Sequence, residues 1–99
     1  MALMHLTVIP LNAGSISIGD YIADIQAALA EAGFPHTLTD MGTIVEGSSK
    51  ELLALAAELA ERPFSRGVDR VLTQLTLDDR RDRKVSLGDK RASVEARLR

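Results

Sequence analysis

The alternation of apolar and polar positions along the chain predicts four β-strands. In the first, residues 3–10, one face carries Met4, Leu6 and Val8. Pro10 has no amide hydrogen, so strand pairing should fade there. The other strands are expected over residues 34–40, 43–46 and 69–77. The second and third strands form a hairpin joined at Met41-Gly42, and a loop over residues 11–15 follows the first.

A repeat of three and four residues predicts a helix after that loop. Ser17 suits its N-cap, because a hydroxyl there can accept an orphan backbone N–H, and Asp20 lies near the positive helix end. Gly33 suits the left-handed residue that ends a helix. The apolar face of this helix is expected to carry Ile18, Ile22, Ile25, Leu29 and Ala32.

A second helix is expected between the third and fourth strands. Ser48 and Glu51 have the spacing of a capping box, and Pro63 should end the helix near Arg62. Its apolar stripe consists of Leu52, Leu55, Ala56, Leu59 and Ala60. A last, weakly amphipathic helix is expected to start at Ser86 and to be the least firmly held element.

The element order β-α-β-β-α-β predicts an α+β fold. Two right-handed crossovers give a four-stranded antiparallel sheet with both main helices on one face, which is the ferredoxin-like sandwich with an extra C-terminal helix. The other sheet face, with Ile9 and part of the fourth strand, has no obvious cover. We therefore expect a homo-oligomer that forms by sheet packing or edge pairing.

Composition excludes several function classes. The 99 residues fit a single domain, 1–99, and the absence of Cys excludes disulfides and thiolate chemistry. The net charge of −2 and the lack of aromatic residues on the first and fourth strands argue against nucleic-acid partners. No signal peptide or membrane-spanning run is recognisable, so we expect a cytoplasmic protein without a membrane partner.

Charge is concentrated near the C-terminus. Residues 1–77 hold nine acids and four bases, a net of −5, whereas residues 78–99 hold five acids and eight bases, a net of +3. The densest cluster is Asp78-Asp79-Arg80-Arg81-Asp82. It is either a ligand or metal site at the end of the fourth strand or an ion-pair network that fixes the last helix and an oligomer contact. Charge runs of alternating sign favour the network.

Few residues are placed for catalysis or metal binding. His5 and His36 lack metal-ligand spacing, and no nucleophile motif or phosphate-binding loop occurs, so we predict neither a catalytic nor a metal site. The segment around Gly42 is more suggestive. Gly42 permits a close backbone approach, and Met41 offers a polarizable surface. Thr43 adds a hydroxyl nearby.

Several segments together resemble the YkoF-related thiamine-binding family in its single-repeat form. They are Pro10-Leu11 with the Ser-rich loop and Tyr21, Met41-Gly42-Thr43-Ile44-Val45-Glu46-Gly47, Gly67-Val68-Asp69-Arg70-Val71, Asp78-Asp79-Arg80-Arg81-Asp82, and Asp89-Lys90 with Ser93-Val94. The resemblance covers nearly the whole chain. It implies a ferredoxin-like fold, dimers that assemble into tetramers, and binding of thiamine or its pyrimidine moiety without catalysis or a cofactor.

The resemblance also implies a set of ligand-binding residues, which are Ser17, Met41, Gly42, Thr43 and Glu46. The Glu46 carboxylate would pair with the aminopyrimidine or offset the thiazolium cation, and Met41 would lie against a ring. Ser17 and Thr43 would bond to polar edges of the ligand. The chain departs from the family at Asn12-Ala13, where Gly-Thr is usual, and this loop lies near the expected pocket.

Two other functions stay open from the sequence. One is a structural or regulatory oligomerisation module that binds no thiamine, in which the charged cluster at residues 78–82 builds the interface. The other is an enzyme that acts on a similar small molecule, which no acid–base pair at motif spacing supports.

Overall fold

The computed structural model describes residues 1–12, 14 and 17–99, so residues 13 and 15 of the predicted loop at residues 11–15 lie outside the described residues. The elements follow in the predicted order. They are β1 (Ala2–Leu11), α1 (Ile18–Ala32), β2 (His36–Thr39), β3 (Gly42–Gly47), α2 (Ser49–Glu61), the short 3₁₀ helix η1 (Phe64–Arg66), β4 (Arg70–Asp79) and α3 (Asp89–Arg97).

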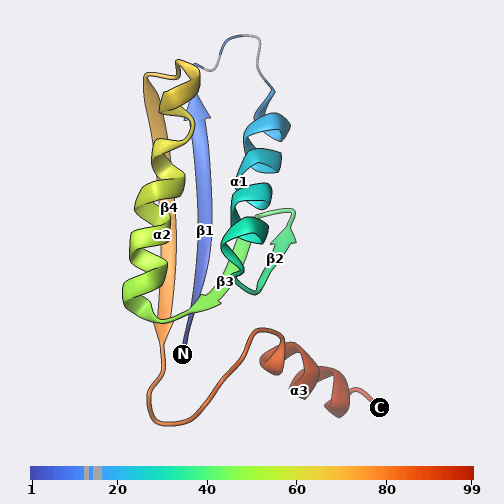
Figure 1. Cartoon of the computed structure of the whole chain (residues 1–99). Helices are drawn as coiled ribbons and strands as arrows, with labels where there is room; N and C mark the ends of the chain where they lie inside the picture. Colours follow the sequence, from blue (N-terminus) through green and yellow to red (C-terminus); the bar gives the residue numbers. More distant parts are fainter. Residues whose placement is uncertain (13, 15–16) are drawn as a thin grey trace.

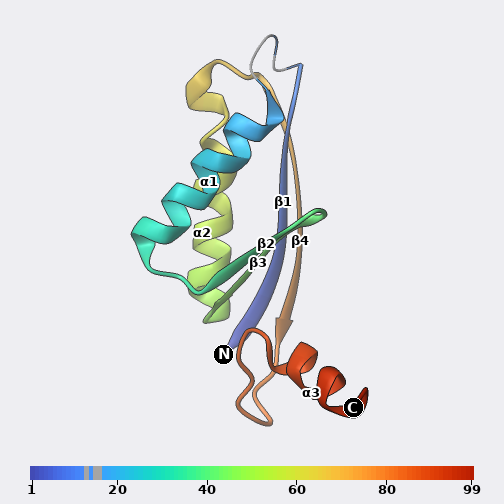
Figure 2. The same ribbon diagram turned by 90° about the vertical axis from the view of Figure 1, so that its right-hand side faces the viewer.

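The four strands form one antiparallel sheet in the order β2-β3-β1-β4. Helices α1 and α2 lie side by side on one face of this sheet, and α3 stands apart beyond its lower end (Figure 1). Figure 2 shows the same arrangement edge on, with the opposite sheet face uncovered by α1 or α2. The predicted ferredoxin-like fold with an additional C-terminal helix is confirmed.

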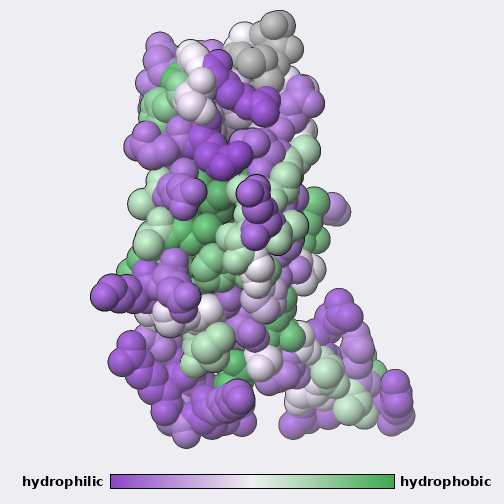
Figure 3. Space-filling view, in the orientation of Figure 1, coloured by the Kyte–Doolittle hydropathy of each residue, from purple (hydrophilic) through white to green (hydrophobic). Residues whose placement is uncertain are grey.

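The core lies between the sheet and the two helices. Every second residue of β1 is buried, including Met4, Leu6 and Val8, as the alternation predicted. The α2 stripe is confirmed in the same way, and its buried members are Leu52, Leu55, Ala56 and Leu59. Viewed from the helix side, apolar surface gathers between α1 and α2 and polar surface covers the flanks (Figure 3).

The buried face of α1 differs from the predicted one. Its buried residues are Tyr21, Ile25 and Leu29, whereas Ile18 is 51% exposed and Ala32 is also exposed. A three-to-four repeat identifies an apolar side of a helix but not the part of it that other elements cover. The uncovered part of this stripe lines a cavity that is described below.

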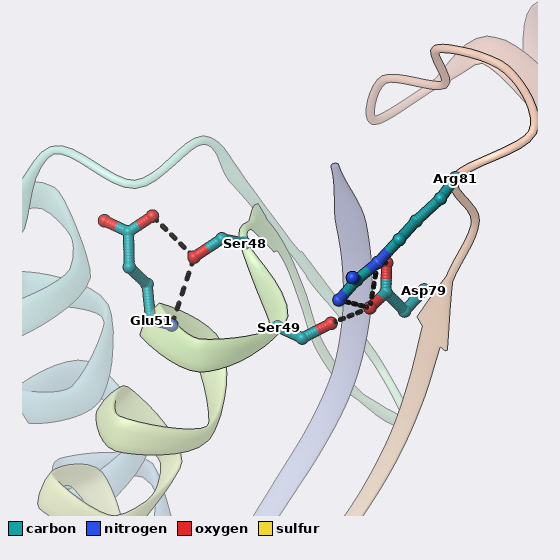
Figure 4. A network of polar contacts seen from close by, with 5 residues as sticks. All are labelled: Ser48, Ser49, Glu51, Asp79 and Arg81. Carbon is teal, nitrogen blue, oxygen red and sulfur yellow. Dashed lines mark hydrogen bonds and ion pairs between the residues drawn. The ribbon is translucent and has the colours of Figure 1, made fainter.

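The predicted helix ends are mostly confirmed. The Ser17 hydroxyl accepts the Asp20 N–H at 3.3 Å, and Gly33 is left-handed with φ of 80°. The Ser48 hydroxyl accepts the Glu51 N–H at 3.2 Å and donates to the Glu51 carboxylate (Figure 4). Helix α2 ends at Glu61, just before Pro63, as expected.

The last helix starts later than predicted. Helix α3 begins at Asp89 after the left-handed Gly88, which supplies no capping side chain. The Asp89 carboxylate instead accepts the Ser86 N–H at 2.8 Å, so Ser86 lies outside the helix. No residue of α3 is buried, in agreement with the expectation of a loosely held element.

Pairing does not fade at Pro10, contrary to the prediction. Strand β1 continues to Leu11, which lies opposite Arg70 of β4. On its other side β1 pairs with β3 only as far as Leu6, which lies opposite Thr43. Beyond Leu6 this side of β1 is a free edge, so the missing N–H of Pro10 costs no ladder hydrogen bond there.

The uncovered sheet face is mixed in character. By register it carries Leu3, His5, Thr7 and Ile9 of β1, Ile44 and Glu46 of β3, and Leu72, Gln74, Thr76 and Asp78 of β4. Leu72 is 46% exposed, and the Ile9 beside it is half-buried.

Within the described part of the chain, no helix combines the length and apolar character that crossing a membrane requires.

Candidate functional site

A cavity of about 280 Å³ lies at the free edge of β1, and we call it the edge cavity. Its walls are one side of α1, residues 6–9 of β1 and residues 38–43 of the β2–β3 hairpin. It exists because β3 leaves β1 after Leu6 while α1 continues across the gap. Its volume is close to the lower end of the range for small-molecule pockets.

The α1 wall of the edge cavity is apolar. It consists of Ile18, Ile22 and Ile25, which is the part of the predicted helix stripe that the sheet does not cover completely. Branched aliphatic side chains offer a surface that can contact the face of a flat ring. Ile18 is exposed because it lines this cavity instead of packing in the core.

One polar pair interrupts this apolar wall. The Gln26 side-chain Nε2 donates a hydrogen bond of 2.9 Å to the Thr43 hydroxyl, and Thr43 is only 5% exposed. A primary amide has two N–H donors and a carbonyl acceptor. Among the described residues, Gln26 therefore keeps one N–H and its carbonyl oxygen for a ligand, held in place by Thr43.

The backbone of β1 supplies a second polar pair. A Cβ added at Gly42 would lie 2.9 Å from the Leu6 carbonyl oxygen, so this carbonyl points toward the β3 side. In an antiparallel strand the N–H and C=O of one residue point to the same side, and this side alternates along the chain. Val8 therefore presents its N–H and C=O to the edge cavity, beyond the end of the β3 pairing.

The tip of the hairpin closes the cavity and is held firmly. The Thr39 hydroxyl donates to the Gly42 carbonyl at 2.9 Å and accepts the Met41 N–H at 3.2 Å. The Thr7 hydroxyl donates to the Met41 carbonyl at 3.2 Å and so ties the tip to β1. These contacts fix the turn at Asp40 and Met41.

A second, more open depression adjoins the edge cavity on the uncovered sheet face. This open-face hollow encloses about 550 Å³ and is lined by His5, Thr7, Ile9, Asp40, Met41, Gln74, Leu75 and Thr76. Thr7, Ile9, Asp40 and Met41 line both spaces, so the two meet at the hairpin tip. Figure 2 shows this tip projecting past the sheet on the side away from the helices.

The structure gathers three of the five predicted site residues in the edge cavity. Met41, Gly42 and Thr43 line it, and Met41 is 79% exposed. Ser17 caps α1 and lies outside the lining, next to Ile18. Glu46 lies on the sheet face opposite to Thr43, where its carboxylate accepts the Leu87 N–H at 2.7 Å.

Sequence reasoning missed several lining residues with functional groups, among them Gln26 and Asp40. Gln26 follows Ile22 by one helical turn, and a polar residue within an apolar stripe is a signal that could have identified it. Asp40 immediately precedes the suggestive Met41-Gly42 segment and occupies the hairpin turn. No motif distinguished it from an ordinary solvated turn residue.

The charged cluster after β4 consists of local ion pairs. Arg81 binds the Asp79 carboxylate at 2.8 Å, and the Ser49 hydroxyl at the start of α2 donates to the same carboxylate at 2.5 Å (Figure 4). The hydrogen bonds from Arg81 and Ser49 lower the pKa of Asp79 to about 2. Arg80 forms a two-point pair with Asp82. A role of the cluster in an oligomer contact stays a prediction.

Metal-binding groups do not gather within the described residues, where no set of three His, Asp or Glu side chains is placed to hold an ion. His36 donates from Nδ1 to the Phe34 carbonyl at 2.7 Å, which fixes its tautomer. His5 lies beside Gly42 on the uncovered sheet face.

Comparison with solved structures places the fold among known ones. A hypothetical protein of Methanocaldococcus jannaschii superposes with a TM-score of 0.83 at 24% identity, over 95% of each chain. A Thermotoga maritima protein, assigned provisionally to thiamine biosynthesis or salvage, gives a TM-score of 0.74 at 19% identity, over 94% of this chain and 97% of that one. At these identities the likeness establishes the fold alone.

Sequence comparison establishes the family. The chain is 38% identical to the UPF0045 protein YqgV of Bacillus subtilis, over 99% of this chain and 98% of that protein. It is 37% identical to a UPF0045 protein of Methanothermobacter thermautotrophicus, over 99% and 100% of the two chains. The family model described as thiamine-binding protein matches residues 4–95. The resemblance found in the sequence is thus confirmed, and the chain belongs to the thiamine-binding protein family.

Proposed function

We propose that the chain binds thiamine or its pyrimidine moiety in the edge cavity and does not transform it. The observation that carries this proposal is the Gln26–Thr43 hydrogen bond inside a cavity with otherwise apolar helix walls. Membership of the thiamine-binding family gives independent support for the ligand class. The gap between α1 and the free edge of β1 gives this small domain a cavity in which such a ligand can bind.

The chemistry of the cavity suits an aminopyrimidine. This ring is flat and carries an amino donor next to a ring-nitrogen acceptor, so it needs an acceptor and a donor side by side. The Gln26 amide and the Val8 backbone each offer such a pair. Ile22 and Ile25 offer surfaces for the ring face, and the Met41 thioether is a polarizable contact at the rim.

Calorimetry with the free pyrimidine, 4-amino-5-hydroxymethyl-2-methylpyrimidine, tests this site. Thr43→Val removes the hydroxyl that holds Gln26 while keeping the side-chain shape. We expect affinity to fall about fivefold, because one oriented hydrogen bond is worth roughly 1 kcal/mol. Thr73→Val is the matched control, since Thr73 is a strand threonine that is half-buried and lies outside the cavity lining. Equal affinity of Thr43→Val and the parent chain would contradict the assignment.

Two further measurements separate the other candidate functions. A thermal shift with thiamine distinguishes a binding protein from an oligomerisation module, because a ligand of the native state must raise the melting temperature. Mass spectrometry of thiamine after incubation tests for turnover. We expect a raised melting temperature and unchanged thiamine.

Self-association through the uncovered sheet face is part of this proposal. The exposed Leu72 lies opposite the half-buried Ile9 on this face, and Ile44 lies on β3 nearby. An apolar surface of this kind is commonly buried by a second copy of the chain. Light scattering at micromolar concentration should give the mass of a dimer or tetramer, and Leu72→Lys should reduce it. A monomeric mass for the parent would exclude the oligomer.

A further inference from the structure

The outer edge of β4 is a long strand edge without the usual protection against pairing. β4 is the last strand in the order β2-β3-β1-β4, so among the described residues it pairs with β1 alone (Figure 1). Its pairing with β1 is continuous from Arg70 to Asp79. The strand, RVLTQLTLDD, contains neither Pro nor Lys, which are residues that commonly block the addition of another strand. This edge is therefore open to a further strand.

The register with β1 determines which backbone groups of β4 point outward. The Leu6 carbonyl points toward β3, and this direction alternates along the strand, so the N–H and C=O of Thr7 point toward β4. Gln74 lies opposite Thr7 and forms the hydrogen-bonded pair with it. Its neighbours along β4 therefore point the other way. The residues that present N–H and C=O groups to the outer edge are Val71, Thr73, Leu75 and Leu77.

Leu75 is exposed at this edge, although its side chain belongs to the helix side of the sheet. It lies opposite Leu6, which is buried in the core, and residues directly opposite in a sheet share a face. Leu75 is nevertheless 40% exposed. A second copy packed on the uncovered sheet face would cover Leu72 but not Leu75, which is on the other face. A strand added at the β4 edge would cover Leu75.

The charges of β4 complement a second copy of the same strand. Arg70 and Asp78 lie near its two ends and on the same sheet face, opposite Leu11 and Leu3. Neither forms an ion pair with another described residue. When two β4 strands lie antiparallel around a two-fold axis at Gln74, Arg70 of each copy is opposite Asp78 of the other. The same register pairs position 71 with 77 and position 73 with 75, which are the positions with outward backbone groups.

We propose that two copies of this chain pair through their β4 strands, antiparallel around a two-fold axis at Gln74, and join their sheets into one continuous sheet. This inference goes beyond the proposed function, because it adds a second interface to the packing through the uncovered face. Two different two-fold interfaces can close an assembly as a tetramer. The edge cavity lies on the other side of β1, toward β3, so the β4 pairing leaves it accessible.

Disulfide formation by single cysteines tests this register, since the chain has no Cys of its own. Gln74→Cys would lie opposite its own copy in a pair without hydrogen bonds, where Cα atoms are about 4.5 Å apart and a disulfide can form. After mild oxidation we expect a covalent dimer on a non-reducing gel. Thr76→Cys is the matched control on the same strand and face, because its copy lies opposite position 72 and out of disulfide reach. Sheets packed face to face are about 10 Å apart, so packing through the uncovered face would not link position 74.

Proline and charge variants of Gln74→Cys test the hydrogen bonds and the ion pairs. Thr73→Pro removes an outward N–H, which an edge strand tolerates, and should abolish the covalent dimer while circular dichroism stays as in the parent. Thr73→Val keeps this N–H and should leave the dimer unchanged. At low salt Arg70→Asp should slow the cross-linking roughly fivefold, because two cross-strand ion pairs become repulsive. Adding Asp78→Arg to it should restore the parent rate.

The outcomes separate this interface from the binding site. Absence of a covalent dimer for Gln74→Cys, or equal cross-linking of Gln74→Cys and Thr76→Cys, would overturn the β4 pairing. Calorimetry with the free pyrimidine should give the parent affinity for Thr73→Pro, since Thr73 lies outside the edge cavity. Failure of the parent chain to bind the free pyrimidine would overturn the proposed function, whereas the cross-linking result would still decide the β4 pairing.

Discussion

The close approach of the hairpin to β1 makes Gly42→Ala a sharp test of the site's architecture. A Cβ at this position would lie 2.7 Å from His5 Nε2, 2.8 Å from Thr7 Oγ1 and 2.9 Å from the Leu6 carbonyl oxygen. Contacts below 3.0 Å force a displacement. The His5 ring can turn aside, but the Leu6 carbonyl belongs to the central strand and cannot move without distorting the sheet. The backbone at Gly42, with φ of 154°, is also one that other residues rarely adopt.

Overpacking of this kind costs about 1–3 kcal/mol. For a domain of this size, each kcal/mol lowers the melting temperature by roughly 4–8 °C. Thermal unfolding followed by circular dichroism measures the loss, and calorimetry with the free pyrimidine should show weaker binding because the hairpin tip is displaced. The double variant His5→Ala with Gly42→Ala should recover only part of the stability, since the Leu6 carbonyl stays in place.

Gly19→Ala is the matched control for this substitution. Gly19 lies in α1, and among the described residues its added Cβ would meet only the Ser17 hydroxyl, at 3.6 Å. Alanine is favoured over glycine in helices, so the melting temperature should stay the same or rise. A parent-like melting temperature for Gly42→Ala would refute the argument that glycine is required for the close approach.

Two further predictions concern the carboxylates at the lower end of the sheet. The pKa of Asp79 is about 2 in the folded chain, below the ordinary 3.8, so its stabilising contribution is present above pH 3.8 and is lost as the pH falls toward 2. Chemical denaturation at a series of pH values should show a steeper acid loss for the parent than for Asp79→Asn, and parallel curves would contradict this. Glu46→Gln should speed amide hydrogen exchange in residues 85–88, because a neutral amide is a weaker acceptor for the Leu87 N–H than the carboxylate. Its affinity for the free pyrimidine should match the parent's, and a loss of affinity would instead favour the ligand role expected from the sequence.

Strand periodicity could have resolved one ambiguity in the predicted site. Thr43 and Glu46 are three residues apart, and side chains at an odd spacing on a strand point to opposite faces. The structure shows this separation, with Thr43 in the edge cavity and Glu46 bonded to Leu87 on the other side. A family motif groups residues by sequence position, whereas a binding site groups them by face.

Other parts of the site depend on packing that no local pattern reveals. The apolar repeat of α1 correctly located Ile18 and Ile22 on one side of the helix, but the end of the β1–β3 pairing decides that they line a cavity. That end follows from the length of the hairpin and its tight turn. The pairing of Gln26 with Thr43 joins residues from two elements, so only the tertiary fold brings them together.

The free edge of β1 also bears on how the protein avoids pairing with strands of other chains. A row of unpaired backbone donors and acceptors is a template on which a foreign strand can add. Beyond Leu6, the alternation that turns Val8 toward this edge turns Pro10 the same way, and Pro10 has no hydrogen to donate. An incoming strand would therefore lose its ladder after a single residue. A small flat ligand needs only the N–H and C=O of Val8. Pro10 therefore lets a small ligand bind at this edge while it prevents another strand from pairing along it.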